Sequence, residues 1–238
     1  MKPPRPFPMI FRHFRTLLST ASLILTANFL MADHHGEPLF DGKTLNAWKA
    51  PDMSYWSVEN GTITAKSTDE HPCTHNQFLV WQGGEIGDFE LSLKFRVDGG
   101  PKANSGVQVE ADGHVKGYQV DIAQPEAPYL GAVYDEKGRK MLATRGQSTL
   151  IQADGTMKSS ELGGEKDAAL KEYQSGEWAS YRIRFVGNKL QVWLNGVQTA
   201  EVIDDQEEER EMSGILALQL HSGPPMTVQF KDIVLKKL

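Results

Sequence analysis

The chain of 238 residues contains a single cysteine, Cys73, so no internal disulfide bond can form. It also lacks CxxC, HExxH and GxSxG motifs and a Gly-rich phosphate loop. These absences argue against thiol-redox, zinc-protease, serine-hydrolase and nucleotide sites. Stability therefore has to come from a hydrophobic core, which a chain of this length can supply. We expect no organic cofactor.

Long apolar runs are also missing, apart from one near the start. Residues 17–30 are apolar except for Ser, Thr and Asn, and the preceding segment is basic with no acidic residue. The apolar run is shorter than the roughly 20 residues of a membrane span. With Met31-Ala32 as a cleavage end, the pattern predicts a secretory signal peptide over residues 1–32. We expect a periplasmic or secreted protein with no stable membrane span after cleavage. An uncleaved anchor is the alternative.

Positive charge is scarce in the remaining chain. The predicted leader removes four of the 25 Lys and Arg residues and no acidic residue, so 21 basic residues face 31 acidic ones, a net charge of −10. An excess of negative charge disfavours nucleic acid and anionic membranes as partners. Residues 33–238 contain no linker-like run, which favours one domain.

Strand-like alternation of apolar and polar residues recurs along this domain. Residues 89–97 place Phe, Leu, Leu and Phe on one face, and residues 181–186 repeat the pattern. Asn60-Gly61 and Asn195-Gly196 each separate two alternating segments, which is a strong hairpin signal because both turn residues need positive φ. Helical composition is confined to residues 166–173. The sequence predicts an all-β, single-domain sandwich or jelly roll.

Three of the alternating segments end their polar face in a residue that can move a proton. These residues are Glu110, Asp121 and His221, and each follows a glutamine by two positions, namely Gln108, Gln119 and Gln219. Side chains two apart on a strand share a face. Such a face suits a polyhydroxylated ligand and acid–base chemistry, although a merely solvated sheet surface or a lectin-like groove fits the pattern too.

The spacing of the two carboxylates carries mechanistic information. If residues 107–110 and 118–122 pair across the intervening loop, Glu110 and Asp121 lie on neighbouring strands, about 5 Å apart at Cβ. Two carboxylates at that distance raise one another's pKa, which suits a proton donor beside a base. A wider spacing resembles that of inverting glycosidases. The sequence leaves this open, and also leaves open a divalent metal between the two.

Further polar and aromatic residues are candidates for sugar binding. Asn104 precedes the first alternating segment, and Tyr134, Asp135 and Arg139 belong to a segment dense in hydrogen-bonding groups, although a plain charged turn looks the same. Trp81, Tyr129 and Tyr134 are candidates for stacking on a sugar ring, whereas we expect Trp48, Trp56 and Trp193 to lie in the core. The paired histidines His34/His35 and His71/His75 are best read as loop residues.

Motifs along nearly all of residues 37–238 resemble one known family. They include Leu39-Phe40-Asp41-Gly42-Lys43, Gly87-Asp88-Phe89-Glu90-Leu91, Asn104-Ser105-Gly106-Val107, Gly117-Tyr118-Gln119-Val120-Asp121, Trp193-Leu194-Asn195-Gly196 and Leu218-Gln219-Leu220-His221-Ser222-Gly223. Their order is similar to that of the 3-keto-disaccharide hydrolase family. The resemblance implies a concanavalin/LamG-like jelly roll that is exported.

The resemblance also implies an activity. Members act on glycosides whose glucose C3 hydroxyl has been oxidised to a ketone, which acidifies the C2 hydrogen. Cleavage then needs a base near C2, an acid near the glycosidic oxygen and donors to the C3 oxygen. We expect Asp121 as base, with Glu110 or His221 as acid. Gln119, Gln219, Asn104 and Arg139 are the candidate donors to the C3 oxygen.

The chain departs from the family's patterns at these positions. Val109-Glu110 stands where relatives often carry an arginine, and the carboxylate of Asp121 comes two positions later than usual. Two functions therefore follow from the sequence: a glycoside hydrolase or lyase for 3-keto-disaccharides, or a lectin-like carbohydrate-binding domain without catalysis. A structural envelope domain is a third option.

Overall fold

The structure is a computed structural model that describes Met1 and residues 36–164, 167–171 and 173–238. Apart from Met1, the predicted signal peptide over 1–32 lies outside the described residues, as do His34 and His35. Within the described ranges, no helix combines the length and apolar character needed to cross a membrane.

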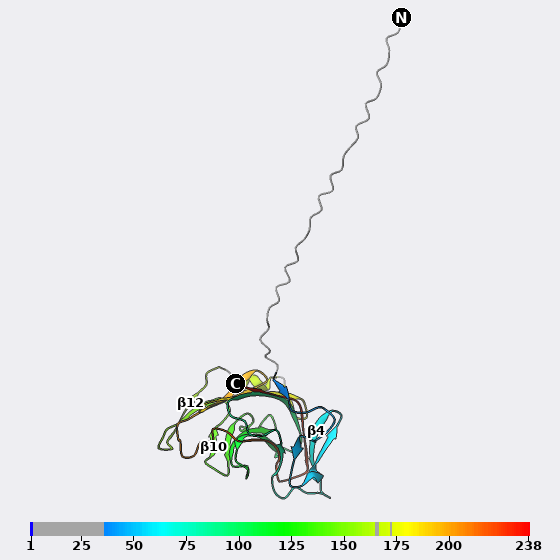
Figure 1. The fold of residues 1–238 in the computed structure, drawn as a ribbon, viewed down its shortest axis with the longest axis horizontal. Coiled ribbons are helices and arrows are strands. Elements are labelled where there is room, and N and C mark those ends of the chain that lie inside the picture. Colours follow the sequence, from blue (N-terminus) through cyan, green and yellow to red (C-terminus); the bar gives the residue numbers. More distant parts are fainter. Residues whose placement is uncertain (2–35, 165–166, 172) are drawn as a thin grey trace. The chain divides into compact units, whose positions relative to one another are not determined.

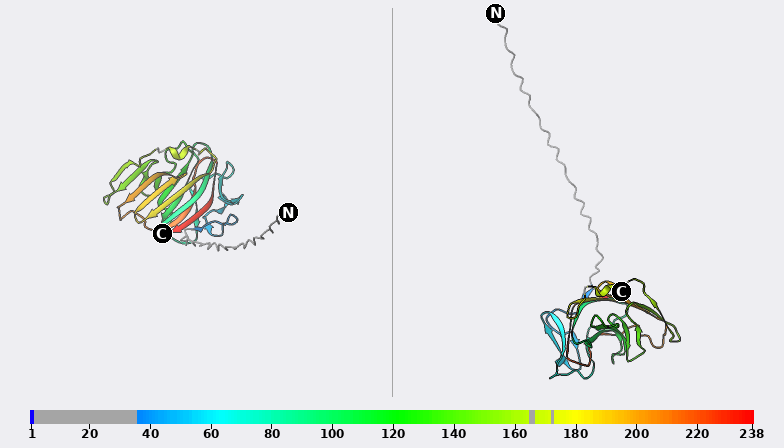
Figure 2. Two further views of the ribbon diagram at one scale, coloured as in Figure 1. Left: turned by 90° about the horizontal axis from the view of Figure 1, so that it is seen from above. Right: turned by 180° about the vertical axis from the view of Figure 1, so that it is seen from behind.

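The domain is a sandwich of two β-sheets (Figure 1). The larger sheet runs in the order β12 (Met157–Glu161), β11 (Gln147–Ile151), β15 (Val197–Asp204), β14 (Lys189–Leu194), β13 (Ala179–Val186), β6 (Phe89–Gly99), β17 (Met226–Lys237), β4 (Thr62–Ser67) and β3 (Trp56–Glu59), with β1 (Glu37–Pro38) paired to β17. Figure 2 shows its long, mostly antiparallel strands side by side. Only β11 and β15, among these pairs of the described residues, run parallel.

The smaller sheet curves beneath the larger one in Figure 1. Its order is β10 (Lys140–Ala143), β9 (Val133–Glu136), β8 (Gly117–Ala123), β7 (Asn104–Ala111), β16 (Ile215–Leu220), β5 (Gln77–Trp81) and β2 (Trp48–Lys49). The remaining elements are two short 3₁₀ turns, η1 (Met53–Tyr55) and η2 (Ala168–Leu170). The all-β jelly-roll prediction is confirmed. Of the segment with helical composition, residues 166 and 172 lie outside the described residues, and the described part forms the 3₁₀ turn η2.

The core lies between the sheets and follows from strand alternation. In β6, every second residue from Phe89 to Val97 is at most 2% exposed, whereas the residues between them are more open. Tyr118 of β8 packs edge-on against Phe185 of β13 with ring centroids 5.1 Å apart, which joins the two sheets. Burying each large apolar side chain stabilises the fold by roughly 1.5–3 kcal/mol.

Both predicted hairpins form at the Asn-Gly pairs. Asn60 and Gly61 connect β3 to β4 with φ of 50° and 76°, and Asn195 and Gly196 connect β14 to β15 with φ of 48° and 81°. Positive φ at both central residues is the requirement of a type I′ turn, whose twist matches that of the flanking strands. These turns set the register of strands that carry the core.

Candidate functional site

The outer face of the smaller sheet carries polar residues in rows that cross several strands. The β7–β8 register sets Gln108 opposite Gln119 and Gly106 opposite Asp121, and Gln119 in turn faces Tyr134 of β9. Extending the β16–β7 register by three residues beyond the Leu218–Val107 pair sets His221 opposite Asn104. The alternating pattern of the sequence therefore produces one continuous polar surface on β9, β8, β7 and β16.

Gln119 is the centre of this surface. Its Oε1 accepts hydrogen bonds from Gln108 Nε2 at 3.2 Å and from Gln219 Nε2 at 2.9 Å, while its Nε2 donates to Asp121 Oδ1 at 2.8 Å. The side chain crosses Gly106, where an added Cβ would lie only 2.4 Å from Gln119 Cδ. The glycine of the Asn-Ser-Gly motif thus leaves the room that this amide network needs.

A cavity of about 410 Å³ opens over these rows. Its lining combines two carboxyl groups and one imidazole, which can exchange protons, with three amides, two tyrosine rings and one thioether. These residues are Asn76, Asn104, Gln119, Asp121, Tyr129, Tyr134, Glu136, Met141 and His221. Small-molecule sites in proteins typically measure about 300–1,000 Å³. Asp121 and His221 lie on strands separated by β7, so their strand axes are roughly 10 Å apart. A small ligand fits between them.

Asp121 is a buried acid with an unusual proton affinity. Its side chain is 5% exposed, and burial raises its pKa to about 7, helped by the negative charge of Glu136 and opposed by the Gln119 hydrogen bond. The backbone at this residue is fixed from the core, because Tyr181 Oη donates to the Asp121 carbonyl at 2.5 Å. Asp121 can therefore hold or release a proton near neutral pH with Oδ2 left for a ligand.

His221 stands at the end of β16 with one ring nitrogen engaged. Its Nδ1 lies 2.6 Å from the Ser222 carbonyl oxygen. Because a carbonyl oxygen can only accept, Nδ1 must carry a proton. In the neutral ring Nε2 then has a free lone pair, as in other imidazoles that act as bases. Asn76 accepts a hydrogen bond from the Ser222 amide at 2.9 Å and so fixes the turn that carries the histidine.

Glu110 does not share this cavity. The β7–β8 register places Gly106, not Glu110, opposite Asp121, so the spacing of about 5 Å, one of the two that the sequence left open, is wrong. Four residues of strand separate the two positions, which is roughly 13 Å. A register shift between β7 and β16 and a φ of 49° at Glu110 mark a β-bulge at this end of the strand. No metal ion can bridge carboxylates at that distance.

The surroundings of Glu110 keep its carboxyl group protonated. The residue is 1% exposed, and burial raises its pKa to about 9, with further contributions from the negative charges of Asp88 and Glu211. Its Oε2 has no hydrogen-bond partner among the described residues. Glu110 is therefore a neutral, buried carboxylic acid at the opposite end of β7 from the cavity.

Asp135 and Arg139 also lie away from the cavity, on the inner side of the sheet. Arg139 Nε contacts Asp135 Oδ2 and its Nη1 contacts Asp204 Oδ2, both at 2.7 Å, and Tyr118 Oη donates to the same Asp204 oxygen at 2.6 Å. Tyr134 and Asp135 are neighbours on β9, so they point to opposite faces. The pair expected to bind sugar hydroxyls instead forms a buried ion cluster between the sheets.

Of the aromatic residues predicted to contact a sugar, some line the cavity and one does not. Tyr129 and Tyr134 line the cavity, whereas Trp81 is 6% exposed and belongs to the core with Trp48 and Trp56. Trp193 is not in the core: it is half-buried on the outer face of the larger sheet, with Arg182 3.6 Å above its ring.

Three cavity residues, Asn76, Glu136 and Met141, were not predicted from the sequence. His71 and His75 form no metal site. Glu136 was detectable, since it alternates with Tyr134, but Asn76 and Met141 come from segments that only the fold brings together. Among the described residues, no group of three or more His, Cys, Asp or Glu side chains is placed to hold a metal ion. His71 stacks on Tyr55, with ring centroids 4.1 Å apart.

Comparison of the sequence with models of known protein families identifies the family to which this domain belongs. The model of the 3-keto-alpha-glucoside-1,2-lyase-like domain matches residues 36–236, which is nearly the entire described domain. The chain belongs to this family. The match confirms the family resemblance that the sequence motifs carry, and the cavity with Asp121 and His221 lies within the matched domain.

Solved structures with the same fold include carbohydrate-active proteins. A putative glycosyl hydrolase from Parabacteroides distasonis is 22% identical, with a TM-score of 0.58 over 85% of this chain and 98% of that one. A second one from the same organism is 16% identical, with a TM-score of 0.54 over 86% and 94%. The carbohydrate-binding module CBM66 from Bacillus subtilis is 10% identical, with a TM-score of 0.53 over 80% and 96%. At these identities the likeness shows the fold alone. No curated protein matches the sequence significantly.

Proposed function

We propose that this domain cleaves glycosides of a 3-keto-glucose by acid–base chemistry between Asp121 and His221. The observation that carries the proposal is the 410 Å³ cavity, lined by a carboxyl group with a pKa of about 7 and by an imidazole with a free Nε2. The family match supports a glycosidic substrate oxidised at C3. Residues 1–32 would export the enzyme, so the substrate would be met in the periplasm or outside the cell.

The ketone makes this cleavage an elimination. A base removes the C2 proton, and the electron pair of the C2–H bond passes to the C3 oxygen as an enolate. The enolate then collapses, the C1–O bond breaks, and the departing oxygen takes a proton from an acid. The products are an unsaturated 3-keto sugar and an alcohol, and water added across the new double bond completes hydrolysis.

The hydrogen bonds of the two groups favour one assignment. His221 is held with its Nδ1 proton on the Ser222 carbonyl, so Nε2 is the better candidate for the base. Asp121 is protonated up to about pH 7 and suits the acid that serves the leaving oxygen. This reverses the roles expected from the sequence. Asn104, which lines the cavity, is a candidate to donate to the enolate oxygen.

Leaving-group dependence tests the proposal. Purified domain should convert a 3-keto-disaccharide to reducing sugar, and Asp121→Asn should lower kcat at least 100-fold, in line with the loss of one general acid. The same variant should keep most of its activity on a 4-nitrophenyl 3-keto-glucoside, because that leaving group departs without a proton. His221→Ala should lose activity on both substrates and stop exchange of the C2 hydrogen in heavy water.

Two outcomes would contradict this reading. Full activity of Asp121→Asn on the disaccharide would remove Asp121 from the mechanism. Calorimetric binding of ordinary glycans with no turnover of oxidised ones would instead support the lectin-like alternative, which the unpartnered amide oxygens of Asn104, Gln108 and Gln219 also suit.

A further inference from the structure

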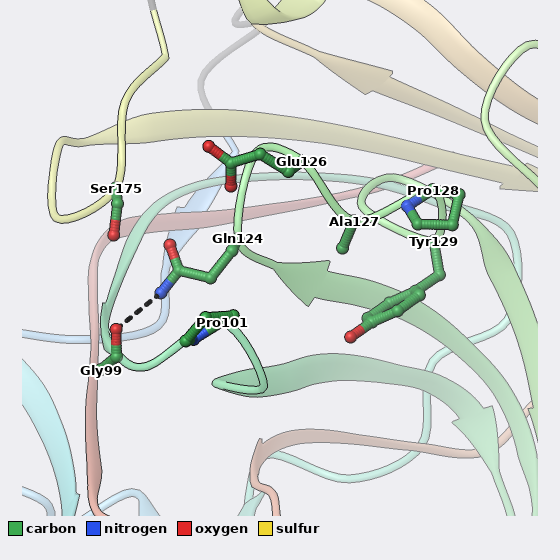
Figure 3. Close-up of a pocket in the computed structure, with 8 residues that line it drawn as sticks. All are labelled: Gly99, Pro101, Gln124, Glu126, Ala127, Pro128, Tyr129 and Ser175. Carbon is green, nitrogen blue, oxygen red and sulfur yellow. Dashed lines mark hydrogen bonds between the residues drawn. The ribbon is translucent and has the colours of Figure 1, made fainter.

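A second cavity, of about 570 Å³, shares one lining residue with the cavity that holds Asp121 and His221. Figure 3 shows the residues that line this second cavity. It is lined by residues of two loops and one further segment: Gly99, Pro101, Gln124, Glu126, Ala127, Pro128, Tyr129 and Ser175. Tyr129 lines both cavities. The tyrosine ring is thus a shared wall between them.

The chain connects the two cavities at two more places. Pro101 belongs to the loop that leads into Asn104, and Gln124 follows Asp121 by three residues at the end of β8. Three residues of extended strand span roughly 10 Å. Because side chains alternate between faces, Gln124 does not extend the row of Asp121; it lies just beyond the end of β8 and reaches toward the Gly99 carbonyl of β6. A ligand held against Asp121 and Asn104 would enter the second cavity past Tyr129, the residue that lines both.

Gln124 gives the second cavity an unused hydrogen-bonding group. The residue is 4% exposed, its Oε1 has no partner among the described residues, and its Nε2 makes one long bond of 3.4 Å to the Gly99 carbonyl, drawn in Figure 3. A buried amide oxygen without a partner carries an energetic penalty that a bound hydroxyl group removes. The last side-chain torsion of glutamine is broad, so the amide can turn to present this oxygen to a ligand in exchange for the long bond to Gly99.

The remaining lining suits the faces of a ring. Pro101, Pro128 and the half-buried Tyr129 offer flat apolar surfaces, and Glu126 offers an exposed acceptor. The loop is also braced, because Arg145 Nη1 donates to the carbonyls of Ala127 at 2.9 Å and Leu130 at 3.3 Å. A fixed wall with a few polar groups is the usual design of a small-molecule site.

We propose that this second cavity binds the sugar ring that leaves from C1, with the ring against Tyr129 and a hydroxyl group on Gln124. The inference rests on the proposed function and places the second ring of its disaccharide substrate in this cavity, which a glycoside with a small aglycone would leave empty. Asp121 then stands between the two rings, where the leaving oxygen has to be protonated.

The test compares a 3-keto-disaccharide with methyl 3-keto-glucoside. Gln124→Ala should lower kcat/KM about tenfold on the disaccharide, the effect of one lost hydrogen bond, and change it less than twofold on the methyl glycoside. Ala127→Trp, which fills the same cavity, should produce a larger selective loss. Gln82→Ala, an exposed glutamine at the far end of β5, is the matched control and should affect neither substrate.

The results separate the two proposals. Equal losses on both substrates, or no loss on either, in correctly folded Gln124→Ala and Ala127→Trp would overturn the subsite while leaving the catalytic proposal in place. A wild-type protein that turns over neither oxidised substrate would overturn the proposed function, and the subsite with it.

Discussion

Replacing Glu110 with glutamine should stabilise the protein at neutral pH. The side chain is 1% exposed, and burial and the neighbouring charges of Asp88 and Glu211 raise its pKa to about 9 from an ordinary 4.5. A raised carboxyl pKa means that the folded state binds the proton more tightly than the unfolded chain does. The stability that comes from this proton is complete below pH 4.5 and is lost as the pH rises toward 9.

The size of this stability difference at pH 7 depends little on the exact pKa of Glu110 in the folded state. At pH 7 the side chain keeps its proton in the folded state. In the unfolded chain it is ionised, because pH 7 lies about 2.5 units above its ordinary pKa. Holding the proton under these conditions costs about 3 kcal/mol. Glu110→Gln has no proton to lose, so it should be more stable than wild type by about 3 kcal/mol at pH 7 and nearly equal at pH 4.

Urea unfolding at pH 4 and pH 7, followed by tryptophan fluorescence, measures this difference directly. Glu208→Gln serves as the control, because Glu208 is exposed and its loss should change stability by less than about 0.5 kcal/mol. A Glu110→Gln variant that is less stable than wild type at pH 7 would falsify the argument, since it would mean that the carboxylate is ionised and paired. We also expect this variant to keep kcat/KM on the 3-keto-disaccharide within a few-fold.

Two further predictions concern the other titratable and charged groups. If Asp121 acts as the acid, kcat/KM on the disaccharide should fall above about pH 7, where burial places its pKa. In a pH–rate series this alkaline decrease should be absent from Asp121→Asn. An alkaline decrease that persists in the variant would belong to another group. Arg139→Met should lower stability by about 3–5 kcal/mol, because two buried aspartates lose their cation. A thermal melt checks the second prediction, and an unchanged midpoint temperature would show that those aspartates do not need the arginine.

Much of the fold was predictable because strand signals are local. The Asn-Gly pairs required positive φ at both residues, and the structure has hairpins at both. The period of two also placed Gln119 and Asp121 on one face and Tyr118 on the other. The same rule applied to residues 133–136 would have put Asp135 with Val133 on the inner face, since Tyr134 alternates with both.

Glu110 shows where the local rule fails. Alternation predicts that Gln108 and Glu110 share a face only while the strand is regular, and a bulge changes the pairing by one residue. The bulge depends on how β7 meets β16, about a hundred residues later in the chain. Asn76 was out of reach for a similar reason: it stands beside His221 only because β5 pairs with β16. Long-range pairing of this kind leaves no mark on a short sequence window.

The buried polar atoms without partners fall mainly into two chemically different sets. Around the two cavities they are amide oxygens, from Asn104, Gln108, Gln124 and Gln219. At the far end of the smaller sheet they belong to carboxyl groups and a guanidinium, from Glu110, Asp135, Glu211 and Arg139. Each unpaired buried group costs about 1–3 kcal/mol, and folds accept such costs mainly at functional sites. The second set can be neutralised internally, by a retained proton or by the arginine. Neutral amide oxygens have no such internal remedy. Two of them, from Asn104 and Gln124, belong to residues that line the cavities, where hydroxyl groups of a ligand would satisfy them.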